Sequence, residues 1–465
     1  MLHLNYDITH LRGAEYNPRH IDDEDLKRLA ESIRTLGLVK PLIVRGDVLV
    51  AGHQRTKALH LLGVTHVTVY VLPFKTTVYD EIRFNQLHNG TDMDSGDEEC
   101  RITGLAGLSG FVQVGADQIT GNLRGRMAYV RKNIADLILK YGSWGGCVAT
   151  ESGEVIHCAQ YALAALATRH NLTVYVVPDG KKDAYQGFLN RKYGHFDYGH
   201  LKRTTYIQTY AQQMRLRNGK RRSTLYEKLV IPSIRKAQRG IDFGAGQGDY
   251  AKMLRNLGYD LHDVELFRRH GGNNTLDLGA IHGMIDKMIL DLKTHGPYDY
   301  VVCDSVLNSV DTLEAEKSVL AMVKGLCRPG GTVFISGRSP EEFQYALRAT
   351  KAGSSQSRLA FIDDNGFSAQ YRKGHWFYQK FHTREEVEGL CRTLGMTIRA
   401  ANFPGNTWYL MARNDSAFDE AGLRKAVEYE FELPLPNGQK IGRSGDILHD
   451  MGIWREGNKN GSEKK

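Results

Sequence analysis

The spacing of hydrophobic positions divides this chain into alternating helices and strands. Between Leu26 and Leu36 the apolar residues recur every three or four positions, as on one face of a helix, and Gly37 follows as a stop signal. Short apolar runs such as 67–71 and 298–304 are bounded by turn residues and predict buried strands. The pattern predicts an α/β fold throughout.

The hydrophobic pattern also repeats. Residues 115–200 resemble a worn copy of residues 10–96. Three anchors share one offset of 105 residues: Asn17 with Asn122, Gly37 with Gly142, and 68–73 with 173–178. We predict two copies of one α/β module. The polar, turn-rich stretch 85–96 is expected to connect them.

The two copies differ at one informative place. Residues 52–55 read Gly-His-Gln-Arg, whereas the second copy reads Ala-Gln-Tyr-Ala at 159–162. The glycine, the histidine and the arginine are all absent from the second copy. We therefore predict that it keeps the core, lacks the chemistry of the first, and serves to enlarge a binding surface.

A glycine motif follows one of the predicted strands. Gly244, Gly246 and Gly248 come directly after the run 241–243, and a helical pattern follows them. Such a turn lets backbone N–H groups approach a nucleotide-like ligand. Glu265 ends the next strand, close to the ~20-residue spacing at which a carboxylate meets ribose hydroxyls. By itself, the G-x-G-x-G spacing also fits an ordinary tight turn.

This segment resembles a class I S-adenosylmethionine-dependent methyltransferase over residues 224–414. The strand 298–304 and the Leu-Cys-Arg-Pro-Gly-Gly turn at 326–331 fit the family's fourth and fifth strands. The resemblance implies a doubly wound, Rossmann-like sheet. It also implies a set of S-adenosylmethionine-binding residues, namely Asp242 at the amino-acid end, Gly244, Gly246, Gly248, Glu265 on the ribose, Asp277 at the adenine, and Asp304.

The acceptor side of this domain is less defined. No proline follows Asp304, unlike in amino-methylating DNA enzymes, and Cys303 lacks the preceding proline of cytosine-C5 enzymes. The Val-Leu-Asn sequence ending at Asn308 is similar to a less characterised group of methyltransferases associated with modified DNA. The insert 354–383 is expected to be a lid, or a long loop that packs its own aromatic residues. The catalytic candidates are Asn308, His375 and Tyr378.

The N-terminal copy resembles the ParB/sulfiredoxin superfamily. Its Gly-His-Gln-Arg stands where chromosome-partition ParB proteins have Gly-Glu-Arg-Arg. The resemblance implies two ParB-like α+β repeats that precede the methyltransferase sheet. It also implies a site for CTP or ATP, formed by Arg19, Gly52, His53, Gln54 and Arg55. The loop has no cysteine, so sulfinate repair is not expected. The alternative is a degenerate module used only for DNA docking or dimerisation.

Composition narrows the class of protein. Hydrophobic residues make up 41% of 465 residues, which is enough for two or three cores, and no apolar run is long enough to span a membrane. Six scattered cysteines without a C-x-x-C pair favour reduced thiols, and argue against a disulfide framework or a zinc site. No secretory signal is apparent at the start, so a cytoplasmic protein is expected.

The expected partners follow from charge and from the resemblance. The net charge is +8, and a basic, tyrosine-containing stretch lies within 198–223. ParB-like domains fused to methyltransferases are familiar from phages and mobile elements, which implies DNA or a modified nucleotide as substrate. A homodimer is possible. Two alternatives remain: a nucleotide-gated DNA-binding protein with a vestigial methyltransferase domain, and a small-molecule methyltransferase.

The sequence also predicts domain boundaries. The first ParB-like repeat is expected at 1–97, the degenerate second repeat at 98–200, and a basic linker at 201–223. The methyltransferase domain is expected at 224–455, followed by a disordered tail at 456–465.

Overall fold

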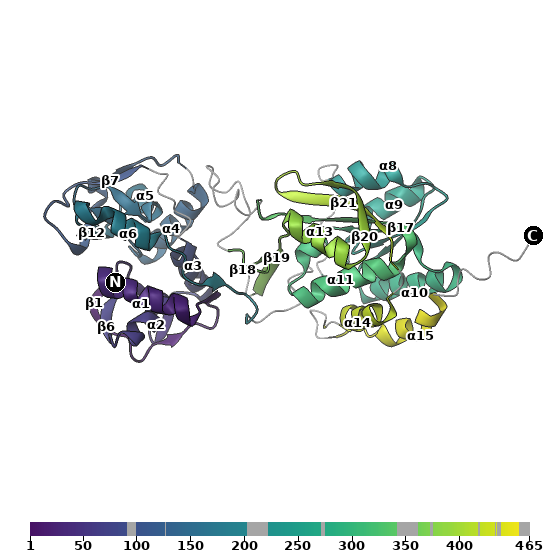
Figure 1. The fold of residues 1–465 in the computed structure, drawn as a ribbon, viewed down its shortest axis with the longest axis horizontal. Helices are drawn as coiled ribbons and strands as arrows, with labels where there is room; N and C mark the ends of the chain where they lie inside the picture. Colours follow the sequence, from purple (N-terminus) through teal and green to yellow (C-terminus); the bar gives the residue numbers. More distant parts are fainter. Residues whose placement is uncertain are drawn as a thin grey trace, which may run out of the picture. The chain divides into compact units, whose positions relative to one another are not determined.

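The computed structural model describes ten stretches of the chain: residues 1–90, 99–125, 127–201, 222–270, 275–341, 361–372, 375–416, 419–432, 434 and 439–454. The chain divides into two compact units (Figure 1). The first unit holds Met1–Leu201 with the described parts of Phe343–Asp364 and Ala369–Gly374, and the second unit holds the remainder. The basic stretch 202–221 and the tail 456–465 lie outside the described residues.

The first module, residues 1–90, is a small sheet with three helices. Its elements are β1 (Leu2–Asp7), β2 (Arg12–Gly13), β3 (Arg19–His20), α1 (Asp23–Leu36), β4 (Leu42–Arg45), β5 (Val48–Ala51), α2 (His53–Leu61), β6 (His66–Val71) and α3 (Val78–Asn89). The sheet order is β1-β6-β4-β5-β2. In this sheet β4 is parallel to β6, whereas β1 and β5 run antiparallel to their neighbours β6 and β4.

Helix α1 begins and ends where the sequence predicts. Asp22 caps its start by accepting a hydrogen bond from the Asp25 N–H at 2.7 Å. Gly37, with a φ of 81°, ends it and donates its N–H to the Ile33 carbonyl at 2.8 Å. Leu29 and Ile33 are buried in the core of the module. The predicted helical face is therefore confirmed.

Helix α3 corrects an expectation. Residues 85–89 were expected to belong to a turn-rich connector, but they form the last turns of this helix. Asn85 is 1% exposed, and its Nδ2 donates to the Val50 carbonyl at 2.7 Å. A polar side chain can be buried when a backbone group satisfies it, so polar composition alone misidentified this segment.

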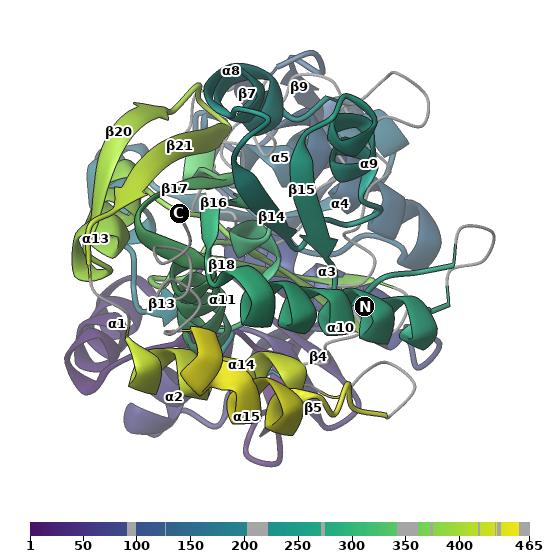
Figure 2. The ribbon, with the colours of Figure 1, turned by 90° about the vertical axis from the view of Figure 1, so that its right-hand side faces the viewer.

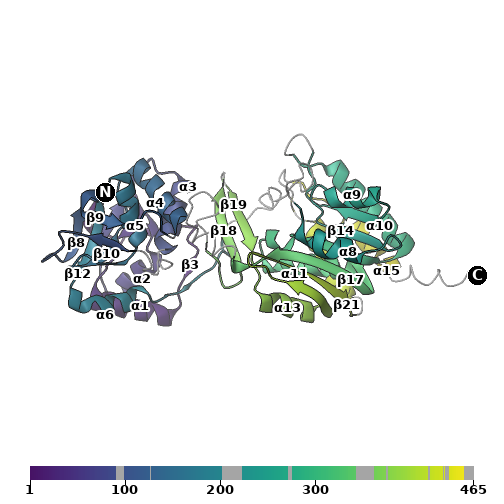
Figure 3. The same cartoon turned by 90° about the horizontal axis from the view of Figure 1, so that it is seen from above.

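The second module, residues 99–201, contains a four-stranded sheet, which lies toward the left of Figure 3. Its elements are β7 (Cys100–Ile102), β8 (Gly110–Val114), η2 (Ala116–Gln118), β9 (Ile119–Gly121), α4 (Ala128–Tyr141), β10 (Cys147–Thr150), β11 (Val155–His157), α5 (Ala159–Thr168), β12 (Leu172–Val177), η3 (Asp179–Lys181), α6 (Lys182–Leu189) and β13 (His195–Phe196). The order β8-β12-β10-β11 and its pairing directions match β1-β6-β4-β5. This agreement supports the proposed duplication.

The end of the second module lies on the first module. Strand β13 pairs antiparallel with β3, so that His195 faces His20 and Phe196 faces Arg19. Tyr193, just before β13, is part of the first module's buried core. The second module therefore contributes a residue to the hydrophobic core of the first.

The second unit is built on a mixed, mainly parallel sheet. Its elements are η4 (Tyr226–Val230), α8 (Ile231–Ser233), β14 (Arg239–Phe243), α9 (Asp249–Asn256), β15 (Asp260–Val264), α10 (Leu278–His295), β16 (Tyr298–Asp304), η5 (Leu307–Ser309), α11 (Leu313–Leu326), β17 (Cys327–Arg338), α13 (Arg384–Thr393), β20 (Met396–Asn402), β21 (Thr407–Asn414), α14 (Glu420–Phe431) and α15 (Ser444–Trp454). The order is β15-β14-β16-β17-β21-β20, with β21 antiparallel to β17. This is the expected doubly wound sheet.

Helices cover both faces of this sheet. Figure 2 shows α8 and α9 on one side, and α10, α14 and α15 on the other. One core packs η4 and α9 against residues such as Leu261 and Tyr300, and the other packs α10, α11 and α14 against residues such as Ile241 and Val301. The chain leaves β14 for β15 on one side, whereas β16 lies on its other side. The strand order therefore reverses at β14, where open α/β sheets bind ligands.

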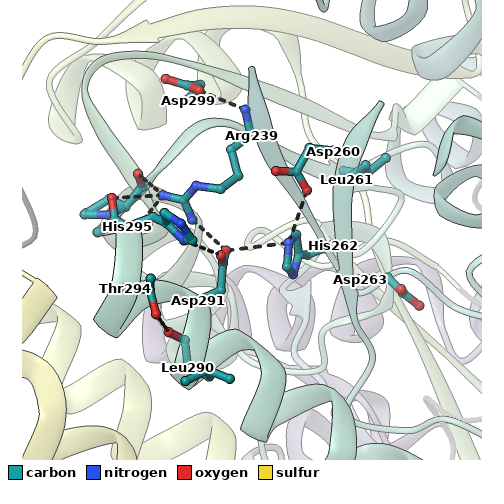
Figure 4. Close-up of polar contacts among 12 residues, drawn as sticks. Arg239, Asp260, Leu261, His262, Asp263, Leu290, Asp291, Thr294, His295 and Asp299 are labelled. Carbon is teal, nitrogen blue, oxygen red and sulfur yellow. Dashed lines mark hydrogen bonds and ion pairs between the residues drawn. The ribbon is translucent and has the colours of Figure 1, made fainter. Parts of the chain in front are cut away.

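A buried ion pair fixes the opposite end of β14. Arg239 Nη1 donates to Asp291 Oδ2 at 2.6 Å, and Nη2 donates to the Gly296 and Pro297 carbonyls at 2.6 and 3.0 Å (Figure 4). The guanidinium thus satisfies carbonyls just after α10, which have no partner within the helix. Arg239 therefore joins β14 to the crossover that runs from β15 through α10 to β16. These contacts lie at the end of β14 opposite to the glycine motif.

Two expectations about the second half of the chain need correction. The Pro-Gly-Gly sequence expected as a turn before the fifth strand lies inside β17, where the pairing with β16 is irregular between Tyr298 and Tyr300. The insert 354–383 is not wholly a loop, since it contains β18 (Phe367–Arg372) and β19 (His375–Lys380), which form a two-stranded sheet. Aromatic residues, which favour strands, are frequent in both of them.

Candidate functional site

The loop after β14 is a tight glycine turn. Gly244, Gly246 and Gly248 have φ angles of 82°, 59° and 69°. A Cβ on Gly244 would lie 2.4 Å from Val306 Cγ2, so a side chain there would displace the loop that follows β16. Gly248 is the N-cap of α9. The turn therefore brings the ends of β14 and β16 together and opens a helix beside them.

Glu265 lies against this turn. Its Oε2 accepts the Gly246 N–H at 2.7 Å, and its Oε1 accepts the Phe267 N–H at 2.9 Å. The side chain is only 7% exposed, and this burial raises the pKa of Glu265 despite both hydrogen bonds. Each carboxylate oxygen retains a lone pair for a further donor.

Arg268 holds the same turn from the other side. Its Nη1 donates to the Gln247 carbonyl at 3.0 Å and its Nη2 to Asp263 Oδ2 at 2.7 Å. Sequence reasoning missed this arginine. No motif in the sequence marks it, and its closeness to Glu265 in the chain is the one signal that could have found it.

Asp242 lies at the end of β14, beneath the turn. It is 4% exposed, and its Oδ2 accepts the Tyr226 hydroxyl at 2.6 Å. Burial raises the pKa of Tyr226 well above its usual range, so this hydroxyl remains a donor. The Tyr226 ring stacks on Tyr250 of α9 at 4.2 Å. Tyr226 was also missed, because it lies on the π-helix η4 and contacts the site only through tertiary packing.

The end of β16 carries a strained residue. Ser305 has a φ of 62°, uncommon for a residue with a Cβ. Its N–H donates to Ser336 Oγ at 2.9 Å, and that hydroxyl donates to Asp304 Oδ1 at 2.6 Å. Strain held by surrounding bonds is common at functional sites. Asp304 is thereby fixed at the strand end beside the glycine turn.

Asn308 follows on the short helix η5. Its side chain is 8% exposed, its Nδ2 lies 3.4 Å from Ser309 Oγ, and its buried Oδ1 has no hydrogen-bond partner among the described residues. Strand β19 packs against η5 and brings the fully buried Tyr378 to the same region. The side chain of His375 lies outside the described part of the chain.

Asp277 has a structural partner already. It is the N-cap of α10, where Oδ1 accepts the Ala280 N–H at 3.0 Å, and its Oδ2 lies 3.1 Å from His270 Nδ1. A capping role explains its position at the helix start. Its role at an adenine ring stays a prediction.

The first unit contains a separate pocket of about 110 Å³ between its two modules. All five residues predicted for a nucleotide line it: Arg19, Gly52, His53, Gln54 and Arg55. The structure therefore brings these five residues together. Sequence reasoning missed the other polar residues of the lining, which are Asn17, Lys40, His88, Asn89, His157, Arg191 and Tyr193.

Two of the pocket's histidines have lowered pKa values, and Arg55 is held in place by hydrogen bonds. Burial lowers the pKa of His53 to about 4 and that of His88 well below its usual range. The Arg55 guanidinium donates from Nη1 to the Lys40 carbonyl at 2.7 Å and contacts His88 Nε2 through Nη2. His53 Nε2 accepts the Ala14 N–H at 3.0 Å. The positive charge of this pocket therefore comes from arginine and lysine.

A polar cluster in the second unit has the spacing of metal ligands. Glu316, His382 and Glu386 offer atoms within 4.8 Å of one another, the one such group among the described residues. The fully buried Lys380 ammonium already bonds to Glu386, and His382 Nε2 lies 2.5 Å from Glu316 Oε1. Each carboxylate thus has a partner, and we assign no metal here. All six cysteines are buried.

Family models match two parts of the chain. Residues 4–84 match the ParB N-terminal domain, and residues 210–400 match a methyltransferase domain. The chain carries a ParB N-terminal domain and a methyltransferase domain. The ParB N-terminal domain contains most of the residues that line the pocket, and the methyltransferase domain contains the glycine turn, Glu265 and Asn308. None of the described helices is long and apolar enough to cross a membrane.

Curated relatives are similar to the ParB N-terminal domain. The chain is 40% identical over 80 residues to stage 0 sporulation protein J of Bacillus subtilis, which covers 16% of this chain and 28% of that protein. It is 41% identical over 69 residues to a probable chromosome 1-partitioning protein ParB of Deinococcus radiodurans, covering 14% and 24%. The chain therefore spans about a quarter of the length of these relatives.

Solved structures are similar to the methyltransferase domain. S-adenosylmethionine-dependent methyltransferases from Methanosarcina mazei and Mesorhizobium loti are both 14% identical, cover 40% and 41% of this chain and 97% of their own, and have a TM-score of 0.28. A Pyrococcus horikoshii protein is 13% identical, covers 41% and 88%, and has a TM-score of 0.31. Scores this low do not establish a common fold, so the fold assignment rests on strand order and on the family model.

Proposed function

We propose that this chain is an S-adenosylmethionine-dependent methyltransferase that acts on DNA or a modified nucleotide. One observation carries the proposal: the buried Glu265 carboxylate accepts the Gly246 N–H, at the point where the strand order reverses. A glycine turn beside an acidic residue at that place suits an adenosine-like ligand. The matched methyltransferase domain supports the same conclusion.

The residues at this edge fit the methyl donor. Glu265 has lone pairs left for ribose hydroxyls, and Gly244 lets the turn pack closely against Val306 after β16. Asp242 and Asp304 supply negative charge near the turn, which suits the ammonium group at the amino-acid end. Asp277 at the start of α10 is assigned to the adenine. When bound, S-adenosylmethionine supplies an electrophilic methyl group.

On the acceptor side, the chain's task is positioning. Transfer of a methyl group from a sulfonium depends mainly on holding the acceptor in line. Asn308 Oδ1, buried and without a partner among the described residues, would accept a hydrogen bond from a substrate N–H. We assign Tyr378 and His375 to the same side of the site, as an orienting hydroxyl and a proton acceptor.

We assign nucleotide binding to the ParB N-terminal domain. Arg19 and Arg55 line its pocket together with Gly52 at the start of α2, an arrangement that suits the phosphates of CTP or ATP. DNA as a partner is supported by the net charge of +8 and by the chromosome-partitioning names of the relatives. A homodimer and a phage-type origin remain part of this proposal.

Calorimetry with S-adenosylmethionine tests the donor site. Glu265→Gln would place an amide NH₂ against the Gly246 or Phe267 N–H, and the affinity should fall by about 1–3 kcal/mol, as for hydrogen bonds to a charged group. Glu428→Gln, an exposed glutamate of α14, is the matched control and should bind normally. If the wild type binds no S-adenosylmethionine, the better assignment is a nucleotide-gated DNA-binding protein whose methyltransferase domain is vestigial.

Mass spectrometry of nucleosides tests the substrate. DNA from cells that express the wild type should contain a methylated nucleoside that is absent when Asn308→Ala replaces it. If S-adenosylmethionine binds but DNA and nucleotides remain unmethylated, the small-molecule methyltransferase is the better assignment.

A further inference from the structure

We propose that the second module completes the nucleotide pocket of the first, with Arg191 as an additional phosphate-binding cation and Phe188 as part of the wall that holds the base. This inference deepens the proposed nucleotide site and depends on it. It gives the degenerate second module a direct role in ligand binding. The lining and the charge of the pocket, and the anchoring of residues 188–196, support this inference.

The lining comes from both modules. Most lining residues belong to the first module, but a group at one side comes from the second: His157, Phe188, Leu189, Arg191 and Tyr193. Leu189 and Tyr193 are 9% and 8% exposed, so the segment is packed into the protein on both sides of Arg191. The pocket is therefore not complete within the first module.

The segment that carries Arg191 is held in place by the first module. The Gly194 N–H donates to Asp25 Oδ2 at 2.9 Å, and the Tyr193 carbonyl accepts Arg19 Nη2 at 2.5 Å. Tyr193 also contacts Ser32 of α1 through its hydroxyl, at 3.0 Å. These bonds fix the backbone two residues from Arg191, so that the cation is positioned at little entropic cost.

Arg191 itself is available to a ligand. It is exposed, and its side chain makes no hydrogen bond or ion pair within the described part of the chain. A planar guanidinium suits phosphate oxygens, which it can bind through two N–H groups at once. The neighbouring Lys192 is equally exposed but does not line the pocket. This neighbour provides a matched control.

The charge of the lining points to a polyphosphate. Four cations line the pocket, Arg19, Lys40, Arg55 and Arg191, and no carboxylate is among its described lining residues. A monophosphate carries about two negative charges at neutral pH, and each further phosphate of a chain adds about one more. A nucleoside triphosphate therefore matches the charge of the pocket better than a monophosphate does.

The remaining wall is apolar. Leu29 and Ile33 of α1 and Phe188 and Leu189 of α6 line it, and the Phe188 ring lies 6.2 Å from the Tyr193 ring. Pockets of this kind hold the apolar part of a ligand while a few polar groups set its orientation. The base of the nucleotide would lie on this wall, with the phosphates toward Arg55 and Arg191.

Calorimetry on the full-length protein tests the inference with CTP, ATP, CMP and inorganic triphosphate. Arg191→Gln should weaken triphosphate binding about tenfold or more, as expected for a lost hydrogen bond to a charged group. The loss should be smaller for CMP. Arg191→Lys should restore part of the affinity, and Lys192→Gln should have no effect. Phe188→Leu should weaken CTP but not inorganic triphosphate.

The outcomes separate this inference from the proposed function. If the wild type binds a triphosphate and Arg191→Gln binds it equally well, the second module is not part of the site. If the wild type binds none of the four ligands, the nucleotide site and this inference both fail. The binding of S-adenosylmethionine by each variant is an independent readout, and it should be unchanged.

Discussion

The two α/β modules of the first unit share a topology but use the same place in opposite ways. In the first module, helix α2 follows Gly52 and presents the half-buried residues His53, Gln54 and Arg55 to a pocket. In the second module, helix α5 follows Cys158, and its first three residues are at most 3% exposed. One helix start lines a pocket and the other is part of a core.

The contrast depends on a few substitutions. Pairing the two N-caps places Cys158, rather than Ala159, opposite Gly52, and therefore Tyr161 opposite Arg55. Tyr161 packs edge-on against Trp144 at 5.0 Å, where Gly145 leaves room for its ring. In the first module, the Lys40 carbonyl binds Arg55 instead. At the paired positions, the second module therefore has a packed aromatic ring where the first has a pocket-lining guanidinium.

The largest effect is expected from emptying the second module's core. Tyr161→Ala should lower the free energy of unfolding by about 3–5 kcal/mol, because it leaves a cavity beside Trp144. Urea unfolding followed by tryptophan fluorescence measures this change. Tyr79→Ala, at a 45% exposed tyrosine, is the control and should cost far less. Equal costs for the two variants would remove the contrast between the modules.

The equivalent change in the first module should affect binding instead. Arg55→Ala removes a guanidinium from the pocket, and CTP or ATP affinity should fall by about 1.5–3 kcal/mol. Tyr161→Phe, at the paired position, should leave that affinity unchanged. Equilibrium dialysis with labelled nucleotide provides the comparison. Normal binding by Arg55→Ala would mean that the first module resembles the second in function as well as in fold.

The helix starts should also differ in their tolerance of a side chain. Gly52 has a φ of 99°, and a Cβ there would lie 2.5 Å from Leu42 Cδ2. We expect Gly52→Ala to cost about 1–3 kcal/mol of stability through backbone strain and overpacking. Cys158→Ala keeps a Cβ at a position that already carries one, and it should cost less. Thermal unfolding of both variants measures this difference in stability. An equal or larger loss for Cys158→Ala would contradict the prediction.

A further expected effect is a dependence of stability on pH that comes from the buried histidines of the first module. The pKa of His53 is about 4 when folded, below its ordinary 6.5, so the unfolded chain binds more protons between these values. This contribution to stability is fully present above pH 6.5 and is lost as the pH falls toward 4. His88 acts in the same direction. Ala159 takes the place of His53 in the second module.

Comparing unfolding midpoints at about pH 7 and about pH 5 tests this dependence. His53→Gln should reduce the loss of stability on acidification, whereas a variant of an exposed histidine, His60→Gln, should not. A full pH slope in His53→Gln would assign the effect to other groups.

Local patterns predicted many of the elements but not their polar partners. The strand 298–304 and the helix ending before Gly37 appear where the sequence places them, because hydrophobic periodicity and glycine are local signals. The connector expected at 85–89 is helical because Asn85 finds the Val50 carbonyl, 35 residues away in sequence. Such a partner cannot be recognised from composition.

The same division applies to the methyltransferase domain. Sequence spacing predicted the glycine turn and its neighbour Glu265, whose contact with Gly246 the structure shows. It did not identify Tyr226 on Asp242 or Arg268 on Gln247. Those contacts join elements that meet only after the sheet is wound, so no local periodicity records them.

By itself, the sequence determined the order of elements, the glycine turn and the loss of Gly-His-Gln-Arg from the second module. Each depends on residue type and short-range spacing, which backbone sterics and burial translate directly into structure. Only the tertiary structure decided which groups share a pocket. Arg191 and Arg55 lie far apart in the chain yet line one cavity, because β13 pairs with β3 and carries the end of the second module onto the first.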